Sequence, residues 1–337
     1  MPNSILQYKK YFLLDLDGTL YRGSKLFPYT KKFIKTLRDS GRKPIFLSNN
    51  SSKSTAEYLQ KLNKIGLAPK EDEIYTSLNA TIEYLQQQGL RRIFLMATPE
   101  VEREFVEAGF ELIKLDEENK TQNSLNKPEN SHESVRAHTH SSQSSKKSTA
   151  HNAQRPDPEM SSAISFFKES SARSKALPQA VVLTFDTTFN YQKFCIAYDY
   201  IMAGVPFYAT HPDTLVPTTD GFHPDIGTLL NAFETAFSAT NQAKEGDATK
   251  ARATTRKPVI IGKPQPIIYQ QLQKRLKCTK NEMIMIGDRL YTDIKGANDY
   301  GITSALVLSG ETTLKMAKKS QVKPELILKN IGEIINF

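Results

Sequence analysis

The sequence predicts an α/β protein whose core is a doubly wound, Rossmann-like parallel sheet with a smaller α/β cap domain inserted into it. Short apolar runs such as residues 11–14 alternate with segments of helical apolar spacing such as 31–40. This alternation is typical of a parallel sheet covered by helices. It restarts after residue 90, between polar clusters at Ser48 and Lys263. A second α/β unit therefore interrupts the first.

The first part of the core is predicted over residues 1–88, and the inserted cap over 89–211. In the first part, the predicted strands are 11–14, 44–47 and 73–76, and the predicted helices are 31–40, 54–65 and 78–88. In the cap, the predicted strands are 93–97, 111–115, 180–185 and 207–210, and the predicted helices are 101–108 and 191–203.

The second part of the core is predicted over residues 212–337. Its predicted helices are 226–237, 267–276 and 292–300, and its predicted strands are 259–261, 283–286 and 303–308. Two polar segments, 117–177 in the cap and 238–257 in the core, lack apolar periodicity, so we expect both to be disordered. Lengthening a loop from ~6 to ~60 residues adds only about 2 kcal/mol of closure entropy, which the fold tolerates.

Two carboxylates directly follow the first predicted strand. Asp15 and Asp17 are one residue apart, and Gly18 allows the chain to turn tightly there. Ligands of open α/β sheets bind at the carboxyl ends of the strands, and carboxylate and carbonyl oxygens suit a hard cation such as Mg²⁺. An Asp-x-Asp-Gly turn also ends many strands without any chemistry, so the motif is not sufficient alone.

Three later predicted strands also end in polar residues, which we expect at the same carboxyl edge of the sheet as Asp15. Ser48 and the amides after it are short groups that can donate hydrogen bonds to phosphate oxygens. Lys263 ends another strand, and Asp288 ends a fourth, with Asp293 five residues on. Each has a structural alternative as a helix cap or a solvated charge. Their order along the chain nevertheless favours one shared site.

Together these segments resemble the motifs of the haloacid dehalogenase-like hydrolases. The matching segments are Asp15-x-Asp17-Gly-Thr19, Ser48, Gly262-Lys263-Pro264 and Gly287-Asp288-x4-Asp293. The flanks of these motifs, at 15–23, 47–51, 75–77 and 287–294, look like those of NagD-type and p-nitrophenylphosphatase-type phosphatases. The resemblance covers most of the chain and implies an α/β cap between the second and third motifs.

The resemblance also implies a mechanism, in which small phosphate monoesters are hydrolysed with Mg²⁺ through an aspartyl-phosphate intermediate. Asp15 would be the nucleophile and Asp17 the general acid and base. Asp15, the Asp17 carbonyl and Asp288 would hold the metal, and Asp293 would orient its waters or Lys263. Phosphate would be bound by Ser48, Asn49 and Lys263, and Lys263 would also act in catalysis by offsetting negative charge beside the metal. The expected substrates are p-nitrophenyl phosphate in vitro and a nucleoside monophosphate, phosphoglycolate or sugar phosphate in vivo.

Substrate specificity is expected from residues beyond the phosphate site. Asn50 is the candidate on the core side, and His211, Asp213 and Val216 are the candidates on the cap side. Val216 precedes a proline where relatives resembling pyridoxal phosphate phosphatases have histidine. The segment 222–227 also departs from the Pro-Gly-x-Gly usual in the group.

The composition favours a cytoplasmic enzyme without nucleic-acid or membrane partners. The net charge of +9 is dispersed, with much of the surplus in the two polar segments, and lacks the interleaved aromatics of a nucleic-acid groove. No apolar stretch approaches the ~20 residues of a membrane span, and the start lacks the apolar segment of a signal peptide. Cys195 and Cys278 lack metal-ligand spacing and are expected to be reduced.

Two other classes of function remain open. A phosphotransferase or mutase on the same core would pass the phosphoryl group to an acceptor other than water. A non-catalytic binding protein would use the cap and the Ser-rich segment to recruit a partner, and would be expected to lack the nucleophile or a metal carboxylate. The sequence keeps these residues, which favours an enzyme, and it leaves open whether two copies form a homodimer.

Overall fold

The computed structural model describes residues 3–113, 177–218, 221–244 and 256–334. Contacts divide the chain into one unit, Met1–Ile113 with Pro178–Phe337, and a second unit, Lys114–Leu177. Except for Leu177, the predicted disordered segment 117–177 lies outside the described residues. The first unit contains both predicted sheets.

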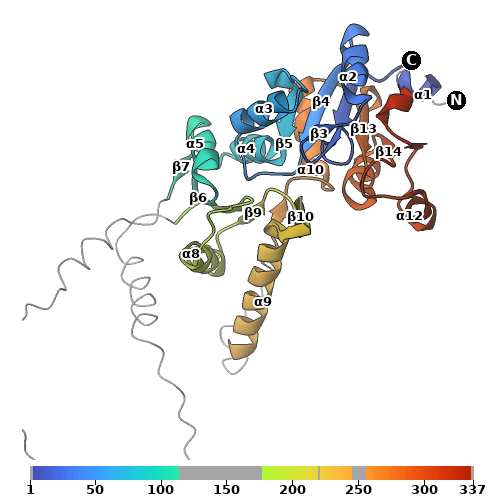
Figure 1. The fold of residues 1–337 in the computed structure, drawn as a ribbon. Coiled ribbons are helices and arrows are strands. Elements are labelled where there is room, and N and C mark those ends of the chain that lie inside the picture. The colour runs from blue at the N-terminus through green and yellow to red at the C-terminus, as the bar shows by residue number, and fades with distance from the viewer. Residues whose placement is uncertain (1–2, 114–176, 219–220, 245–255, 335–337) are drawn as a thin grey trace, which may run out of the picture. The chain divides into compact units, whose positions relative to one another are not determined.

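The core is a six-stranded parallel sheet, which confirms the predicted fold class (Figure 1). In spatial order its strands are β15 (Leu326–Leu328), β14 (Thr303–Val307), β13 (Met283–Gly287), β1 (Tyr11–Leu14), β4 (Lys43–Ser48) and β5 (Ile74–Thr76). Strand β1 pairs with β13 on one side and with β4 on the other. The two ends of the chain therefore build one sheet, with β1 at its centre.

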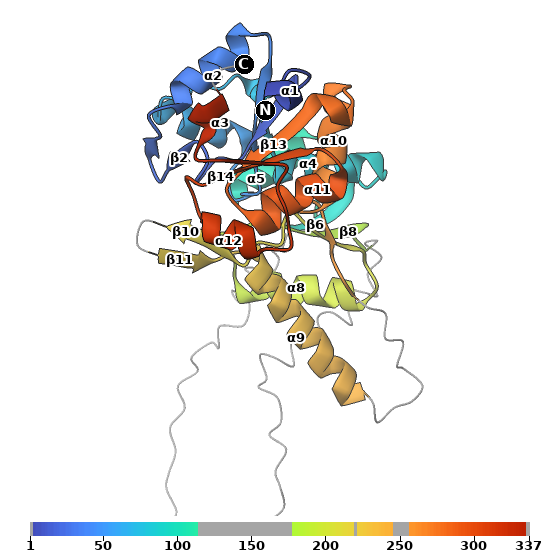
Figure 2. The ribbon, with the colours of Figure 1, turned by 90° about the vertical axis from the view of Figure 1, so that its right-hand side faces the viewer.

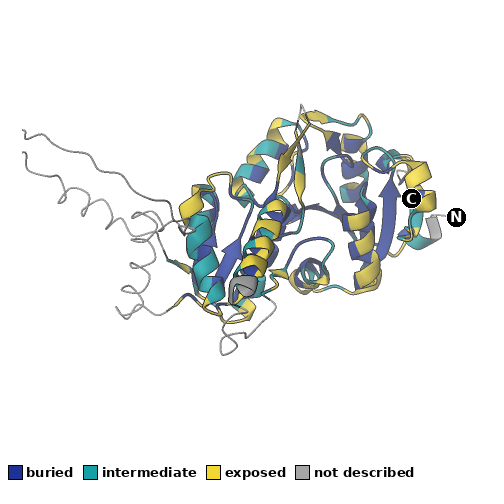
Figure 3. Ribbon diagram, turned by 90° about the horizontal axis from the view of Figure 1, so that it is seen from below, coloured by how far each residue is buried: buried dark blue, intermediate teal, exposed yellow. Residues whose placement is uncertain are grey.

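Alternation along β1 explains why helices cover both faces of this sheet. Phe12 and Leu14 pack in one apolar cluster with α2 (Thr30–Asp39) and α3 (Thr55–Lys64). Leu13 packs in another cluster with α10 (Pro266–Leu276) and α11 (Lys295–Tyr300). Successive side chains of a strand point to opposite faces, so a run that is apolar throughout is buried on both sides. Figure 3 shows the buried strands between helices whose outer faces are exposed.

The inserted unit has its own five-stranded sheet, and one predicted core strand belongs to it instead. The spatial order is β12 (Val259–Ile260), β9 (Phe207–Ala209), β8 (Ala180–Leu183), β6 (Arg92–Met96) and β7 (Glu111–Leu112). We expected 259–261 in the core sheet, but Val259 is in register with Tyr208 of β9. An apolar run predicts a strand without specifying its partner. The domain limits 1–88, 89–211 and 212–337 themselves stay a prediction.

Helix α9 (Ile226–Lys244) packs with the inserted unit as well (Figure 2). The ring of Phe233 in α9 lies 4.3 Å from that of Phe194 in α8 (Tyr191–Met202) and 5.5 Å from that of Phe207 in β9. Residues 238–244 are the end of this helix, so the expectation of disorder over 238–257 is wrong there. Residues 245–255 of that segment lie outside the described part of the chain.

The remaining elements were not all predicted. An antiparallel hairpin of β10 (Leu215–Thr218) and β11 (Gly221–Pro224) precedes α9, and a short pair of β2 (Tyr21–Arg22) and β3 (Lys25–Leu26) follows the Asp15 turn. The other helices are α1 (Asn3–Leu6), α4 (Ser77–Gln87), α5 (Pro99–Glu107) and α12 (Leu314–Lys319). No helix in the described ranges is long and apolar enough to cross a membrane.

Candidate active site

Three neighbouring core strands end in the predicted site residues. Asp15 directly follows β1, Ser48 is the last residue of β4, and Asp288 directly follows β13. Because β1 lies between β13 and β4, Asp15 is central among them. The sheet order thus brings together residues that are far apart in the sequence, at the edge where open α/β sheets bind ligands.

Lys263 lies between two carboxylates of this edge. Its Nζ donates to Asp15 Oδ1 at 2.6 Å and to Asp293 Oδ1 at 2.8 Å, and to the Leu47 carbonyl at 3.3 Å. Burial by itself would lower the pKa of Lys263, but the carboxylates of Asp15 and Asp293 raise it above its usual value. The lysine is therefore a fixed ammonium beside the nucleophile candidate.

Asn49 holds the backbone of Lys263. Asn49 Oδ1 accepts from the Lys263 N–H at 2.9 Å, and Nδ2 donates to the Lys263 carbonyl at 2.9 Å and to Asp213 Oδ2 at 3.2 Å. Both amide hydrogens are thereby used. A Cβ at Gly262 would lie 2.7 Å from Asn49 Oδ1, so this close approach needs glycine. A phosphate contact by the Asn49 amide, as predicted, would require breaking one of these hydrogen bonds.

A group of three carboxylates fits a divalent cation. Single oxygens of Asp15, Asp288 and Asp293 lie within 4.8 Å of one another. Asp288 Oδ2 accepts from the Glu311 N–H at 2.6 Å, whereas Asp288 Oδ1 is buried and has no hydrogen-bond partner among the described residues. A buried carboxylate oxygen without a donor is costly unless a cation occupies it. These residues therefore suit a divalent metal with oxygen ligands.

Burial also sets the protonation of these carboxylates. It raises the pKa of Asp15, to which Asp293 and Asp288 add, while Lys263 lowers it. It raises the pKa of Asp288 too, again with Asp293 adding. The Asp15 side chain is 17% exposed, whereas those of Asp293 and Lys263 are 0% and 3% exposed. Asp15 is thus the member of this group that a substrate can reach.

Both carboxylate oxygens of Asp293 accept hydrogen bonds from the protein, and its orienting role stays a prediction. Its Oδ1 accepts from Lys263, and its Oδ2 accepts from the Arg289 N–H at 3.1 Å. It lies in a π-helical turn, Leu290–Ile294, which together with α11 replaces the single helix predicted over 292–300. Such turns are rare and are frequent at functional sites. Both oxygens of Asp293 already have donors, so its ligand capacity is lower than that of Asp288.

The turn after Asp15 places Asp17 beside the short β2. Gly18 has a φ of +80°, and a Cβ there would lie 2.4 Å from Asp288 Oδ2. Asp17 is half-buried, and its main chain forms an isolated β-bridge with that of Tyr21. Burial raises the pKa of Asp17, while Lys61 and the arginines nearby lower it. A raised pKa suits a residue that must deliver a proton.

Ser48 and Asn50 occupy the loop after β4. The Ser48 hydroxyl lies 3.0 Å from the Tyr58 hydroxyl and accepts from the Asn50 N–H at 3.2 Å. Asn50 Oδ1 accepts from the Ser52 N–H at 3.0 Å and from its hydroxyl at 2.8 Å. The loop is therefore fixed by its own short polar side chains.

The three candidates on the cap side have different surroundings in the structure. Asp213 contacts Asn49, as described, and Val216 is a half-buried member of β10. His211 is fully buried, with Nδ1 3.1 Å from the Thr210 hydroxyl and Nε2 3.1 Å from Asp225 Oδ1. Asp225 belongs to the segment that departs from the Pro-Gly-x-Gly pattern, and here it pairs with His211. The specificity roles of these residues stay predictions.

Several residues at this edge were not predicted. Tyr58 and Lys61 come from α3, which carries no motif that could have indicated them. Arg289 lies inside the motif that ends at Asp293, and its Nε is 3.0 Å from Glu311 Oε2. Its place directly after Asp288 was the signal available in the sequence.

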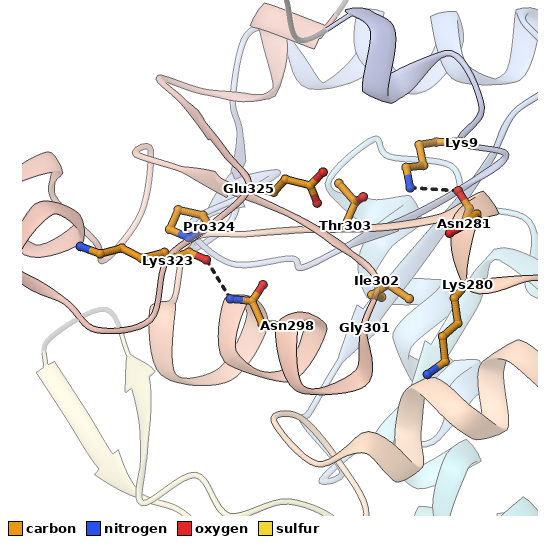
Figure 4. A pocket seen from close by; sticks show the side chains of 10 residues that line it. All are labelled: Lys9, Lys280, Asn281, Asn298, Gly301, Ile302, Thr303, Lys323, Pro324 and Glu325. Carbon is orange, nitrogen blue, oxygen red and sulfur yellow. Dashed lines mark hydrogen bonds between the residues drawn. The ribbon is translucent and has the colours of Figure 1, made fainter.

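A pocket at the opposite edge of the core sheet is separate from this site (Figure 4). It lies at the amino ends of β13 and β14, and its lining includes Lys9, Lys280 and Glu325. None of the predicted site residues lines it.

Comparisons with known proteins agree with the motifs. The family model described as haloacid dehalogenase-like hydrolase matches residues 12–111, and a second, HAD-hydrolase-like model matches residues 260–334. The crystal structure of a 4-nitrophenylphosphatase from Thermotoga maritima is 30% identical, with a TM-score of 0.71, and the match covers 99% of this chain and 98% of that chain.

Two curated relatives are also phosphatases by name. An acid sugar phosphatase of Staphylococcus aureus is 25% identical over 98% of this chain and 97% of its own length. The chloroplastic phosphoglycolate phosphatase 1A of Arabidopsis thaliana is 26% identical over 96% of this chain and 76% of its own length. A structure described as a putative nagD protein is 28% identical, with a TM-score of 0.69, and the match covers 98% of both chains. The chain therefore belongs to the haloacid dehalogenase-like hydrolases, in their NagD-type and p-nitrophenylphosphatase-type subgroup of phosphoric monoester hydrolases.

Proposed function

We propose that the protein is a Mg²⁺-dependent phosphatase that hydrolyses small phosphate monoesters through an aspartyl phosphate on Asp15. The observation that carries this proposal is the position of Asp15, which is exposed enough to reach a substrate and is paired with Lys263 at 2.6 Å. It also lies in the carboxylate group that contains the unpartnered oxygen of Asp288.

In the first step, Asp15 Oδ attacks the phosphorus while the bond from phosphorus to the leaving oxygen breaks. Asp17 gives its proton to that oxygen, so the leaving group departs as an alcohol. In the second step, a water oxygen attacks the phosphorus, Asp17 takes the water's proton, and the bond to Asp15 breaks. Both carboxylates return to their starting states, and the products are an alcohol and inorganic phosphate.

The main obstacle is repulsion between the carboxylates and the phosphate. A pair of charges at ~4 Å is worth about 4 kcal/mol at an effective dielectric near 20, so the Lys263 ammonium offsets part of this repulsion. Asp15 and Asp288, with the Asp17 carbonyl, would hold the metal, and a bound divalent cation would supply the remaining positive charge. Ser48 would donate a hydrogen bond to a phosphoryl oxygen.

The substrate is a small soluble phosphate ester rather than a phosphoprotein or nucleic acid. The names of the relatives suggest sugar phosphates and phosphoglycolate, and nucleoside monophosphates have the same reacting group. A phosphotransferase on the same core stays an alternative, as does a non-catalytic binding protein. The predicted cytoplasmic location and the question of a homodimer are independent of this proposal.

The deciding experiment is a screen of the purified protein against phosphate monoesters, with release of inorganic phosphate measured with Mg²⁺ and with EDTA. We expect release from p-nitrophenyl phosphate and from at least one small metabolite, abolished by EDTA and restored by Mg²⁺. Phosphorylated acceptor without free phosphate would indicate a transferase, and no turnover of any ester would indicate a binding protein.

A further inference from the structure

Lys61 of α3 lies beside the catalytic cluster but belongs to none of the sequence motifs. Its Nζ donates to the Tyr21 hydroxyl at 3.3 Å and lies 5.3 Å from the centre of the Tyr21 ring and 5.8 Å from that of Tyr58. Both tyrosines are buried. The Tyr58 hydroxyl contacts Ser48, and Tyr21 forms the bridge with Asp17. Two aromatic rings therefore fix this ammonium between the phosphate-binding loop and the Asp17 turn.

Lys61 differs from Lys263 and Arg289, because no carboxylate in the described ranges forms an ion pair with it. Lys263 is paired with Asp15 and Asp293, and Arg289 is paired with Glu311. In the described ranges, Lys61 forms no ion pair with a carboxylate; its hydrogen-bond partner is the neutral Tyr21 hydroxyl. A partly buried ammonium that no carboxylate contacts directly has lost hydration that a charged ligand would replace.

The surroundings of Lys61 place it on one side of the site. Burial lowers the pKa of Lys61, the Asp17 carboxylate raises it, and the neighbouring Lys53 lowers it further. Lys61 in turn lowers the pKa of Asp17. The nucleophile Asp15 is paired with Lys263 instead. Lys61 contacts Tyr21, whose main chain forms the β-bridge with Asp17. In the proposed mechanism Asp17 protonates the leaving oxygen, so this contact puts Lys61 on the side of the leaving group.

We propose that Lys61 binds a second negative charge, carried by the leaving group of the substrate. The preferred substrates are then phosphate monoesters whose alcohol part bears a carboxylate or another phosphate. This inference rests on the proposed phosphatase function and narrows its substrate class. Exposed Lys53, on the loop after Asn50, adds a second positive charge nearby and strengthens the same preference.

The test compares two esters that differ in this charge, 2-phosphoglycolate and 2-hydroxyethyl phosphate. For the wild type we expect a higher kcat/KM for 2-phosphoglycolate. Lys61→Met keeps the length and apolar contacts of the side chain. It should lower the ratio of kcat/KM for 2-phosphoglycolate to kcat/KM for 2-hydroxyethyl phosphate by about tenfold, whereas the loss of a positive charge near Asp17 changes both rates alike. Lys61→Arg should retain most of the preference, because it keeps the positive charge.

Lys64→Met is the matched control, since Lys64 is an exposed lysine near the end of the same helix. It removes the same charge from the protein and should leave both esters unaffected. If Lys61→Met does not fold, the wild-type preference is measured at increasing salt concentration, where it should decrease as the charges are screened.

An equal fall in kcat/KM for both esters in Lys61→Met would overturn the inference. So would a wild-type preference for 2-phosphoglycolate that does not change with salt concentration. Hydrolysis of p-nitrophenyl phosphate with no preference for 2-phosphoglycolate would overturn it and leave the phosphatase proposal intact. Absence of turnover with all three esters would overturn both.

Discussion

The side-chain amide of Asn49 pairs with the main-chain N–H and C=O of Lys263, both at 2.9 Å. The loop after β4 therefore fixes the lysine that follows β12, and with it the ammonium that contacts Asp15. The third hydrogen bond of the amide, to Asp213, connects the same point to the segment after β9. Asn49 thus holds Lys263 and Asp213, which come from distant parts of the chain.

Replacing Asn49 by Ala should therefore lower both stability and turnover. It leaves buried main-chain groups of Lys263 without partners, and each such group costs about 1–3 kcal/mol. We expect the free energy of unfolding to fall by about 2 kcal/mol or more in urea denaturation, and kcat to fall by about tenfold or more. Asn50→Ala is the control, because the donors to Asn50 Oδ1 among the described residues are the N–H and the hydroxyl of Ser52, two residues away. Equal free energies of unfolding of the two variants would contradict the positioning role of Asn49.

Asp15→Asn should abolish turnover of p-nitrophenyl phosphate while the fold survives. Asn has the shape of Asp but is not a nucleophile, so kcat should fall by several orders of magnitude. The loss of one partner of Lys263 leaves Asp293 to hold the ammonium. The measurement is phosphate release in Mg²⁺, with circular dichroism as the control for folding. A variant that kept even about a tenth of the wild-type rate would exclude the aspartyl-phosphate mechanism.

Asp288→Asn should raise the Mg²⁺ concentration needed for activity, whereas Asp17→Asn should lower kcat with little change in that midpoint. The reason is that Asp288 would bind the metal with its side chain, and Asp17 with its main-chain carbonyl. A second readout is the rise in Tm on adding Mg²⁺, expected for any ligand that binds the folded state. This rise should be present in the wild type and in Asp17→Asn and reduced in Asp288→Asn. Identical magnesium titrations for all three proteins would remove Asp288 from the metal site.

Excising residues 121–174 should change neither Tm nor the hydrolysis of p-nitrophenyl phosphate. The segment has too little apolar content to build a core of its own. Its flanks lead from β7 and into β8, which pair with the two sides of β6, so they are about 10 Å apart and a short linker joins them. A scrambled segment of the same composition is the control for loop length. A fall in Tm on excision would show that the segment folds against the cap.

The sequence by itself determined five of the six strands of the core sheet and the residues at their ends, and it missed β15. Asp15, Ser48 and Asp288 each follow an apolar run that is buried on both faces of the sheet. Such a run can be predicted as a strand without knowing its partners, because its consecutive residues are all apolar. Helices such as α2 and α10 were predicted correctly because their apolar residues recur with helical spacing. The motif residues then indicated which edge of the sheet carries the site.

Tertiary structure decided which elements pair and which side chains meet. The run Val259–Ile260 joined β9 rather than the core sheet, since strand pairing depends on which edge is free in space. Asn49 and Lys263 are 214 residues apart, and their hydrogen bonds exist only once two sheets and a glycine bring the main chains together. The pairing of His211 with Asp225 and the place of Lys61 between two tyrosines likewise depend on packing. Local patterns cannot encode such contacts, because a hydrogen bond needs its partners within about 3 Å.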